Sequence, residues 1–200
     1  MAAGPAGGTS PSGTGGTGDA GGTGRVFLHF TMSLDGFIAD AAGGLAWAAG
    51  FTGLSAETVT AIIESIGAAL GGRHGYDVAV AAGGARLYGG AWDGPVFVLT
   101  HRPGDVPADP DVTFLSGTLR EAVGTARAAA GGKDVVIVGA SIGQQCLAQG
   151  LADEILLHVV PVVLGGGIQL FAASAAPVTL RPVSVEQSGD VTTMRYAVQR

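Results

Sequence analysis

The fold is decided by residues 134–150, whose sequence is DVVIVGASIGQQCLAQG. After Asp134 the stretch is apolar up to Gly139, which is typical of a strand at the centre of a parallel sheet. A helix is predicted from about Ile142 to Gln149, because Gly150 is a common C-terminal stop for a helix. A buried strand that passes through a glycine-containing turn into a helix indicates an α/β domain.

The same alternation continues on both sides of this stretch. Further strands are predicted at residues 26–32, 68–70, 96–100, 112–115 and 154–164, helices at 55–65, 75–82 and 118–130, and an antiparallel pair at 178–187 and 191–198. Ser55 and Thr118 are the expected N-caps of two helices. We predict a three-layer α/β fold with a central mixed, mostly parallel sheet and a C-terminal antiparallel pair.

Composition divides the chain into a tail and one domain. Residues 1–24 consist mainly of Gly, Thr, Ser, Ala and Pro, and we expect a disordered tail there because so little apolar surface can be buried. The domain is expected to span residues 25–200. The tail has the pattern of neither a signal peptide nor a transit peptide, and no apolar stretch reaches the roughly 18 residues of a membrane span. We therefore expect a cytoplasmic protein without a membrane partner.

Charge and cysteine content exclude several function classes. The chain has 10 basic and 16 acidic residues and a net charge of −6, so nucleic acid is not an expected partner. Its single cysteine, Cys146, excludes an internal disulfide and a four-cysteine zinc site. The four histidines have no metal-ligand spacing, so no metal is predicted.

The candidate site lies in the turns that follow the strands, because ligands of open α/β sheets bind beyond the carboxyl ends of the strands. The turns at residues 71–75 and 139–143 contain glycines and lead directly into helices, whose N-termini attract phosphate. Arg73 adds a fixed charge, and Thr100, His101 and Arg102 follow a neighbouring strand. This combination favours NADPH over NADH. Because Gly-Ala-Ser is common after a strand, spacing alone leaves phosphate binding open.

Several short motifs in a fixed order resemble a known family. They are residues 32–39 (MSLDGFIA) with Trp47 downstream, Gly72-Arg73, residues 98–102 (VLTHR), Val138-Gly139, residues 150–154 (GLADE), residues 161–167 (PVVLGGG) and Leu170-Phe171. Together they resemble the dihydrofolate-reductase-like NADPH reductases, near the C-terminal reductase domain of the bifunctional riboflavin-biosynthesis deaminase-reductase. The resemblance covers residues 25–198 and implies a stand-alone member with a dihydrofolate-reductase-like fold.

The resemblance also implies roles for individual residues. Thr31 and Ile38 would line the nicotinamide ring, Arg73 and His74 would contact cofactor phosphates, and Thr100, His101 and Arg102 would surround the adenosine 2′-phosphate. Gly139, Ala140, Ser141 and Ile142 would bind the pyrophosphate, with Gln144 near the nicotinamide. Ser33, Asp35, Gly165 and Gly166 would lie at the substrate. The implied activity is NADPH-dependent hydride transfer to a small heterocyclic or carbonyl-like acceptor, and the implied assembly is a homodimer. The C-terminal strands are the candidate interface, because their apolar content leaves an edge to be covered.

The chain departs from the family pattern at two positions. Ala140 follows Gly139 where the family has two glycines, and Gly75 replaces a phosphate-binding threonine. These changes keep open the alternative of a non-catalytic nucleotide-binding or assembly module that keeps the fold. Dihydrofolate itself is a poor substrate prediction, because residues 48–52 lack the acid that holds a pterin ring.

Other residues have two possible interpretations. Asp35 either terminates its strand by bonding its own turn or orients the substrate. It would donate the reaction's proton only if burial raised its pKa, and water is the other possible donor. The glycines at 165–167 either shape the site or form a bend. His29 and His158 lie inside predicted strands and are expected to be structural, and Trp47 is expected to be a packing residue.

Overall fold

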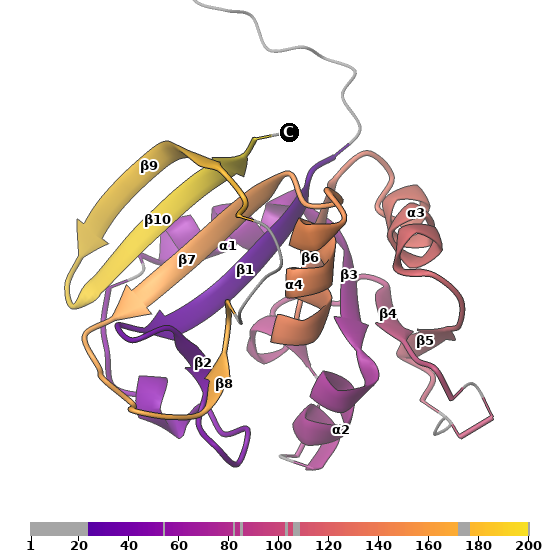
Figure 1. The fold of residues 1–200 in the computed structure, drawn as a ribbon, viewed down its shortest axis with the longest axis horizontal. Coiled ribbons are helices and arrows are strands. Elements are labelled where there is room, and N and C mark those ends of the chain that lie inside the picture. The colour runs from indigo at the N-terminus through magenta and orange to yellow at the C-terminus, as the bar shows by residue number, and fades with distance from the viewer. Residues whose placement is uncertain are drawn as a thin grey trace, which may run out of the picture.

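The computed structural model describes residues 24–53, 55–81, 83–84, 86–102, 104–105, 109–171 and 177–199. Residues 1–23 of the predicted tail lie outside this set. Within it, eight strands form one sheet in the order β5-β4-β3-β6-β1-β7-β10-β9 (Figure 1). The strands are β1 (Val26–Ser33), β3 (Ile66–Gly72), β4 (Val96–Leu99), β5 (Val112–Leu115), β6 (Asp134–Ile137), β7 (Glu154–Val160), β9 (Leu180–Ser188) and β10 (Val191–Val198).

The sheet is mixed and mostly parallel, as predicted. All pairs from β5 through β7 are parallel, whereas β10 pairs antiparallel with both β7 and β9. All the parallel strands therefore end at the same edge of the sheet, which we call the carboxyl edge. A second, two-stranded sheet of β2 (Phe37–Ala39) and β8 (Ile168–Gln169) lies beside it.

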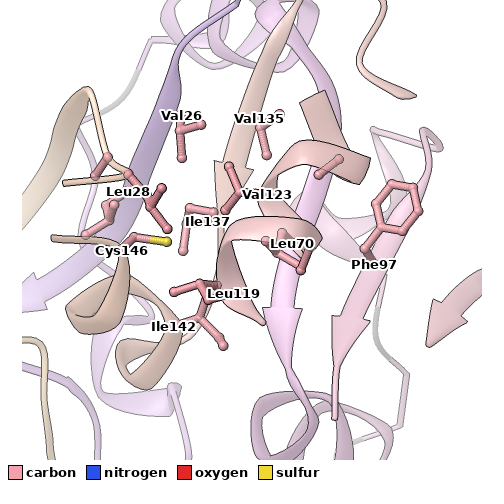
Figure 2. Packing of buried hydrophobic residues seen from close by; sticks show 14 of the residues in the cluster. Val26, Leu28, Leu70, Phe97, Leu119, Val123, Val135, Ile137, Ile142 and Cys146 are labelled. Carbon is pink, nitrogen blue, oxygen red and sulfur yellow. The ribbon is translucent and has the colours of Figure 1, made fainter. Parts of the chain in front are cut away.

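Helices cover both faces of the large sheet. On one face, α3 (Leu119–Ala129) and α4 (Ala140–Ala148) pack against alternate residues of the strands. Figure 2 shows this core, in which Leu28, Leu70 and Ile137 meet Val123 of α3 and Cys146 of α4. On the other face, α1 (Ala56–Ser65) packs through Ile62 against a smaller cluster. We call these the α3–α4 face and the α1 face.

Capping residues place two helices where the sequence predicts them. The Ser55 side chain accepts from Thr58 N at the start of α1. Thr118 and Glu121 form a reciprocal capping box at the start of α3. The remaining helix, α2 (Arg73–Ala81), follows β3 directly, and two 3-10 turns are found at η1 (Ala46–Ala48) and η2 (Leu87–Gly90). No helix in the described ranges is long and apolar enough to cross a membrane.

Several predicted boundaries are wrong, and the strand expected at 68–70 spans Ile66–Gly72. The strand expected over 154–164 ends at Val160, because Pro161 has no N–H to continue a ladder. The helix expected from Ile142 begins at Ala140, since Gly139 at φ +89° turns the chain at once. The helix expected from Gly75 likewise begins earlier, at Arg73.

Candidate functional site

Three turns converge at the carboxyl edge. Thr100, Arg73 and Ser141 follow β4, β3 and β6, which are neighbouring parallel strands. The N-termini of α2 and α4 also meet there, because a Cβ on Gly72 would lie only 3.1 Å from the Ile142 side chain. The three turns therefore lie at the same edge of the sheet, as the sequence predicts. Two helix N-termini side by side make this edge attractive to an anion.

Arg73 is held in a fixed orientation. Its Nε donates to Asp77 Oδ1 at 2.7 Å, its Nη1 donates to the carbonyl of Asp105, and its guanidinium lies 5.9 Å from the centre of the Phe114 ring. The guanidinium has five N–H donors, so these contacts leave donors for a ligand. His74, the next residue of α2, has an exposed side chain.

The turn after β4 has one buried and two exposed candidate residues. Thr100 is only 3% exposed, and its Oγ1 accepts from Arg102 N at 3.0 Å. This hydrogen bond shapes the turn, while the side chains of His101 and Arg102 are exposed. The turn therefore presents Arg102, a permanent cation, on the same edge as Arg73.

The start of α4 combines buried and exposed groups. Ala140 and Ile142 are buried, so the methyl group of Ala140 packs inward, whereas Ser141 is exposed and its Oγ accepts from Gln145 Nε2 at 3.2 Å. Gln144 Nε2 donates to the carbonyl oxygens of Gln169 and Leu170, at 3.2 and 2.9 Å. These bonds tie α4 to β8.

The end of β1 forms a closed turn. The buried Ser33 Oγ donates to Asp35 Oδ1 at 2.7 Å, and the Asp35 carboxylate also accepts from the backbone N–H groups of Leu164 and Gly165, at 3.0 and 2.7 Å. Desolvation alone would raise the pKa of Asp35, but the hydrogen bonds from Ser33, Gly165 and Leu164 outweigh it and lower the pKa. Asp35 therefore lacks the raised pKa that it would need as the proton donor. Gly165 has φ +69°, and Gly166 is exposed beside it.

A cavity of about 360 Å³ opens at the end of β1 and β7. Its wall consists of Thr31 of β1, His158 and Val160 of β7, Val191 of β10, Ala48 at the end of η1, and Phe51, Thr52 and Gly53 in the segment that follows. Of the predicted site residues only Thr31 lines it, and Ile38 packs against the α3–α4 core instead. The sequence gives no signal for the β7 part of the wall, because the pairing of Thr31 with His158 joins residues far apart in the chain.

Two histidines near this cavity contact each other. His29 Nε2 lies 2.8 Å from His158 Nε2, His29 Nδ1 lies 2.9 Å from Tyr88 Oη, and His158 Nδ1 lies 3.0 Å from Thr193 Oγ1. Burial, followed by the positive charges of His158 and Arg195, lowers the pKa of His29 to about 3. Burial and then Arg195 lower the pKa of His158 to about 4. Both rings are therefore neutral near pH 7. Together with Tyr88 and Thr193 they form a polar chain, which the prediction of structural histidines did not include.

The described residues contain no group of His, Cys, Asp or Glu side chains that could hold a metal ion. The groups that the site does offer are backbone N–H donors, arginines, hydroxyls and neutral imidazoles. These suit an anionic organic ligand at the carboxyl edge and a small polar molecule in the cavity.

Comparison with known proteins identifies relatives over almost the whole domain. The family profile of the RibD C-terminal domain matches residues 25–194. The uncharacterized protein YwjB of Bacillus subtilis strain 168 is 26% identical over 172 residues, which make up 86% of this chain and 97% of YwjB.

Solved structures share the fold. A protein provisionally assigned to riboflavin biosynthesis in Shewanella sp. PV-4 superposes with a TM-score of 0.72 at 24% identity, covering 88% of this chain and 99% of that one. The diaminohydroxyphosphoribosylaminopyrimidine deaminase/5-amino-6-(5-phosphoribosylamino)uracil reductase of Thermotoga maritima gives 0.66 at 18% identity, covering 88% of this chain and 57% of that one. Dihydrofolate reductase of Enterococcus faecalis complexed with NADP(H) gives 0.59 at 14% identity, covering 89% and 98%. The predicted dihydrofolate-reductase-like fold is confirmed.

Proposed function

Since the chain belongs to the RibD C-terminal domain family, we propose that it is an NADPH-dependent reductase acting on a small heterocyclic or carbonyl-like acceptor, similar to the riboflavin-pathway pyrimidine reductase. The observation that carries the proposal is the meeting of two helix N-termini and two arginine-bearing turns at one sheet edge. That arrangement fits a dinucleotide with several phosphates.

The residues at the carboxyl edge would hold the cofactor. Its pyrophosphate would bind to the backbone at the start of α4, at Gly139, Ala140, Ser141 and Ile142, and to Arg73 and His74 at the start of α2. The 2′-phosphate would bind beside Thr100, His101 and Arg102. The nicotinamide would extend toward Thr31, Ile38 and Gln144. When bound, NADPH supplies the hydride, and the protein's part is to bind and orient it.

The departures from the family pattern are compatible with this placement. Ala140 is buried, so its methyl group does not occupy the exposed side of the helix N-terminus. Gly75 has open space where a side chain would be, so its lack of a threonine hydroxyl removes one contact without distorting the turn. Both observations favour the reductase over the non-catalytic alternative.

The acceptor would bind in the cavity at Thr31 and His158, next to the nicotinamide end. A cavity of about 360 Å³ has the size of small-molecule sites, and it combines apolar walls with a hydroxyl and an imidazole. Trp47, next to Ala48 of the wall, has a buried indole N–H with no hydrogen-bond partner in the described part of the chain. The two turns that contain Ser33 and Asp35, and Gly165 and Gly166, would support this site from the side, because the Asp35 carboxylate is already bonded to the backbone N–H groups of Leu164 and Gly165.

Cofactor binding is the first test. We expect saturable uptake of NADPH, followed by its fluorescence, and weaker uptake of NADH. Arg73→Ala should weaken NADPH binding roughly 10- to 100-fold, because hydrogen bonds to charged groups contribute about 1.5–3 kcal/mol. Arg181→Ala, which removes an exposed arginine of β9, is the matched control and should leave binding unchanged.

Turnover is the second measurement. Wild-type protein should oxidise NADPH when 5-amino-6-(5-phosphoribosylamino)uracil is supplied, the compound reduced by the Thermotoga relative. If calorimetry detects uptake of neither reduced nicotinamide nucleotide, the reductase proposal is wrong and the non-catalytic module is favoured. If NADPH binds but this compound is not reduced, the riboflavin-type acceptor is wrong.

A further inference from the structure

A continuous polar chain crosses the α1 face of the sheet and reaches the cavity. Tyr88 lies in η2, His29 in β1, His158 in β7 and Thr193 in β10, and each side chain is within 3.0 Å of the next. His158 is only 3% exposed, yet it lines the cavity wall. The chain therefore links a partly exposed tyrosine to the place where the acceptor would bind.

The facing nitrogens give this chain two arrangements of hydrogens. His29 and His158 are both neutral, and their Nε2 atoms lie 2.8 Å apart, so only one of the two can carry the hydrogen between them. Either Tyr88 donates to His29, which donates to His158, or every donor and acceptor is reversed. One arrangement converts into the other when each hydrogen moves to the next atom.

Apolar side chains would fill these positions at lower cost. The buried His158 and the half-buried His29 lose hydration in the fold, which a pair of leucines would not. Tyr88 adds strain, because it is the only non-glycine residue with positive φ (+53°) in the described ranges. The left-handed region is strained for a tyrosine, and such strain clusters at functional sites. Its ring stacks on His29 at 5.6 Å between centroids, which holds the hydroxyl at the end of the chain.

We propose that Tyr88, His29 and His158 relay to the acceptor the proton that must accompany hydride transfer. This relay rests on the proposed function. The acceptor carbon gains the hydride with its electron pair, the electrons of its double bond move to the attached nitrogen or oxygen, and that atom takes a proton from His158 Nδ1, directly or through the Thr193 hydroxyl. His158 Nε2 then takes the hydrogen of His29 Nε2, His29 Nδ1 takes that of Tyr88, and solvent reprotonates the tyrosine oxygen.

Burial and nearby charge keep the relay neutral. Burial is the main cause of the lowered pKa values of both histidines, and the positive charge of Arg195 of β10, which is itself paired with Glu154, lowers them further. A relay of neutral groups has no member that titrates between about pH 6 and pH 8, so turnover limited by this step should be independent of pH there.

Tyr88→Phe tests the relay because it removes the hydroxyl and keeps the ring that stacks on His29. We expect kcat to fall about 10²-fold, as for the loss of general acid catalysis, with an unchanged KM for NADPH. His158 must then first take a proton from solution, so the rate should fall with rising pH, whereas the wild-type rate stays flat. Tyr196→Phe is the matched control, since the Tyr196 hydroxyl donates to the sulfur of Met194 and takes no part in the relay.

Nitrogen-15 NMR of the histidines in the unliganded protein gives a readout that needs no turnover. The relay requires opposite tautomers, with the hydrogen on Nδ1 in one of the two rings and on Nε2 in the other. The same tautomer in both rings, or a Tyr88→Phe variant with wild-type kcat and a flat pH profile, overturns the relay while the proposed function stands. Absence of NADPH uptake by the wild type overturns the proposed function, and the relay fails with it.

Discussion

The Asp35 carboxylate connects two turns of the structure, a role that its position in the sequence after β1 does not indicate. It accepts from the N–H groups of Leu164 and Gly165 and from the hydroxyl of Ser33, and so joins the turn after β1 to the turn after β7. An amide oxygen in its place would accept fewer of these bonds, and the amide nitrogen would face an N–H group.

We expect Asp35→Asn to lower the melting temperature at neutral pH. Because the folded-state pKa of Asp35 lies below its ordinary value of 3.8, its contribution is complete above that value and is lost as the pH falls through the folded-state pKa. The difference in melting temperature between wild type and variant should therefore shrink as the pH is lowered below about 4. Asp93→Asn, at another exposed aspartate, is the control. A difference that persists in acid would contradict the role of the ionised carboxylate.

At the scale of elements, an ion-pair network ties together the N-terminal ends of the parallel strands. Arg25, at the start of β1, pairs with Asp134 of β6 at 2.7 Å and with Glu154 of β7 at 2.9 Å. The other oxygen of Glu154 accepts from Arg195 of β10 at 2.6 Å. One nearly buried carboxylate therefore links three strands.

Glu154→Gln should lower the free energy of unfolding by about 2 kcal/mol, because it removes the anion paired with Arg195 and one of the two anions paired with Arg25. The cost falls below that of a fully buried pair since the Arg25 side chain is 47% exposed. Asp77→Asn is the matched control, because it breaks an exposed pair with Arg73 on one helix and should cost less than about 0.5 kcal/mol. Urea denaturation measures both values, and equal losses would sink the argument.

Elements were predictable where the signal is local. The Thr118 cap placed α3, and the apolar run after Asp134 placed β6, because both patterns depend on neighbouring residues. The small sheet of β2 and β8 was not predicted, since strands of three and two residues show no periodicity.

The candidate site divides in the same way. The turns at Arg73, Thr100 and Ser141 were predicted to converge, because parallel strands share one carboxyl edge. The contact of His29 with His158 was not, because it depends on the register between β1 and β7, and 129 residues separate the two. Site residues that directly follow a strand can be inferred from the sequence. Contacts between side chains on neighbouring strands can be inferred only once the register between those strands is known.

At the scale of the whole molecule, the two parts of the proposed site lie on one side of the domain and leave β9 free for another role. β9 is the last strand of the sheet, and its Val183 and Val185 are 48% and 59% exposed. An edge strand with exposed valines tends to pair with another chain unless it is covered. A second copy of this chain, related by a two-fold axis, would cover both edges at once.

We therefore expect a homodimer through β9, with a solution mass about twice the 19.6 kDa of one chain. Val185→Lys should shift light-scattering or sedimentation measurements toward the monomer, because a charged side chain on an edge strand opposes strand pairing. Val80→Lys, at a valine of α2 that is 48% exposed, is matched in side chain and exposure and should stay dimeric. A wild-type chain that remains monomeric as its concentration rises, or two lysine variants that dissociate equally, would show that β9 is not the interface.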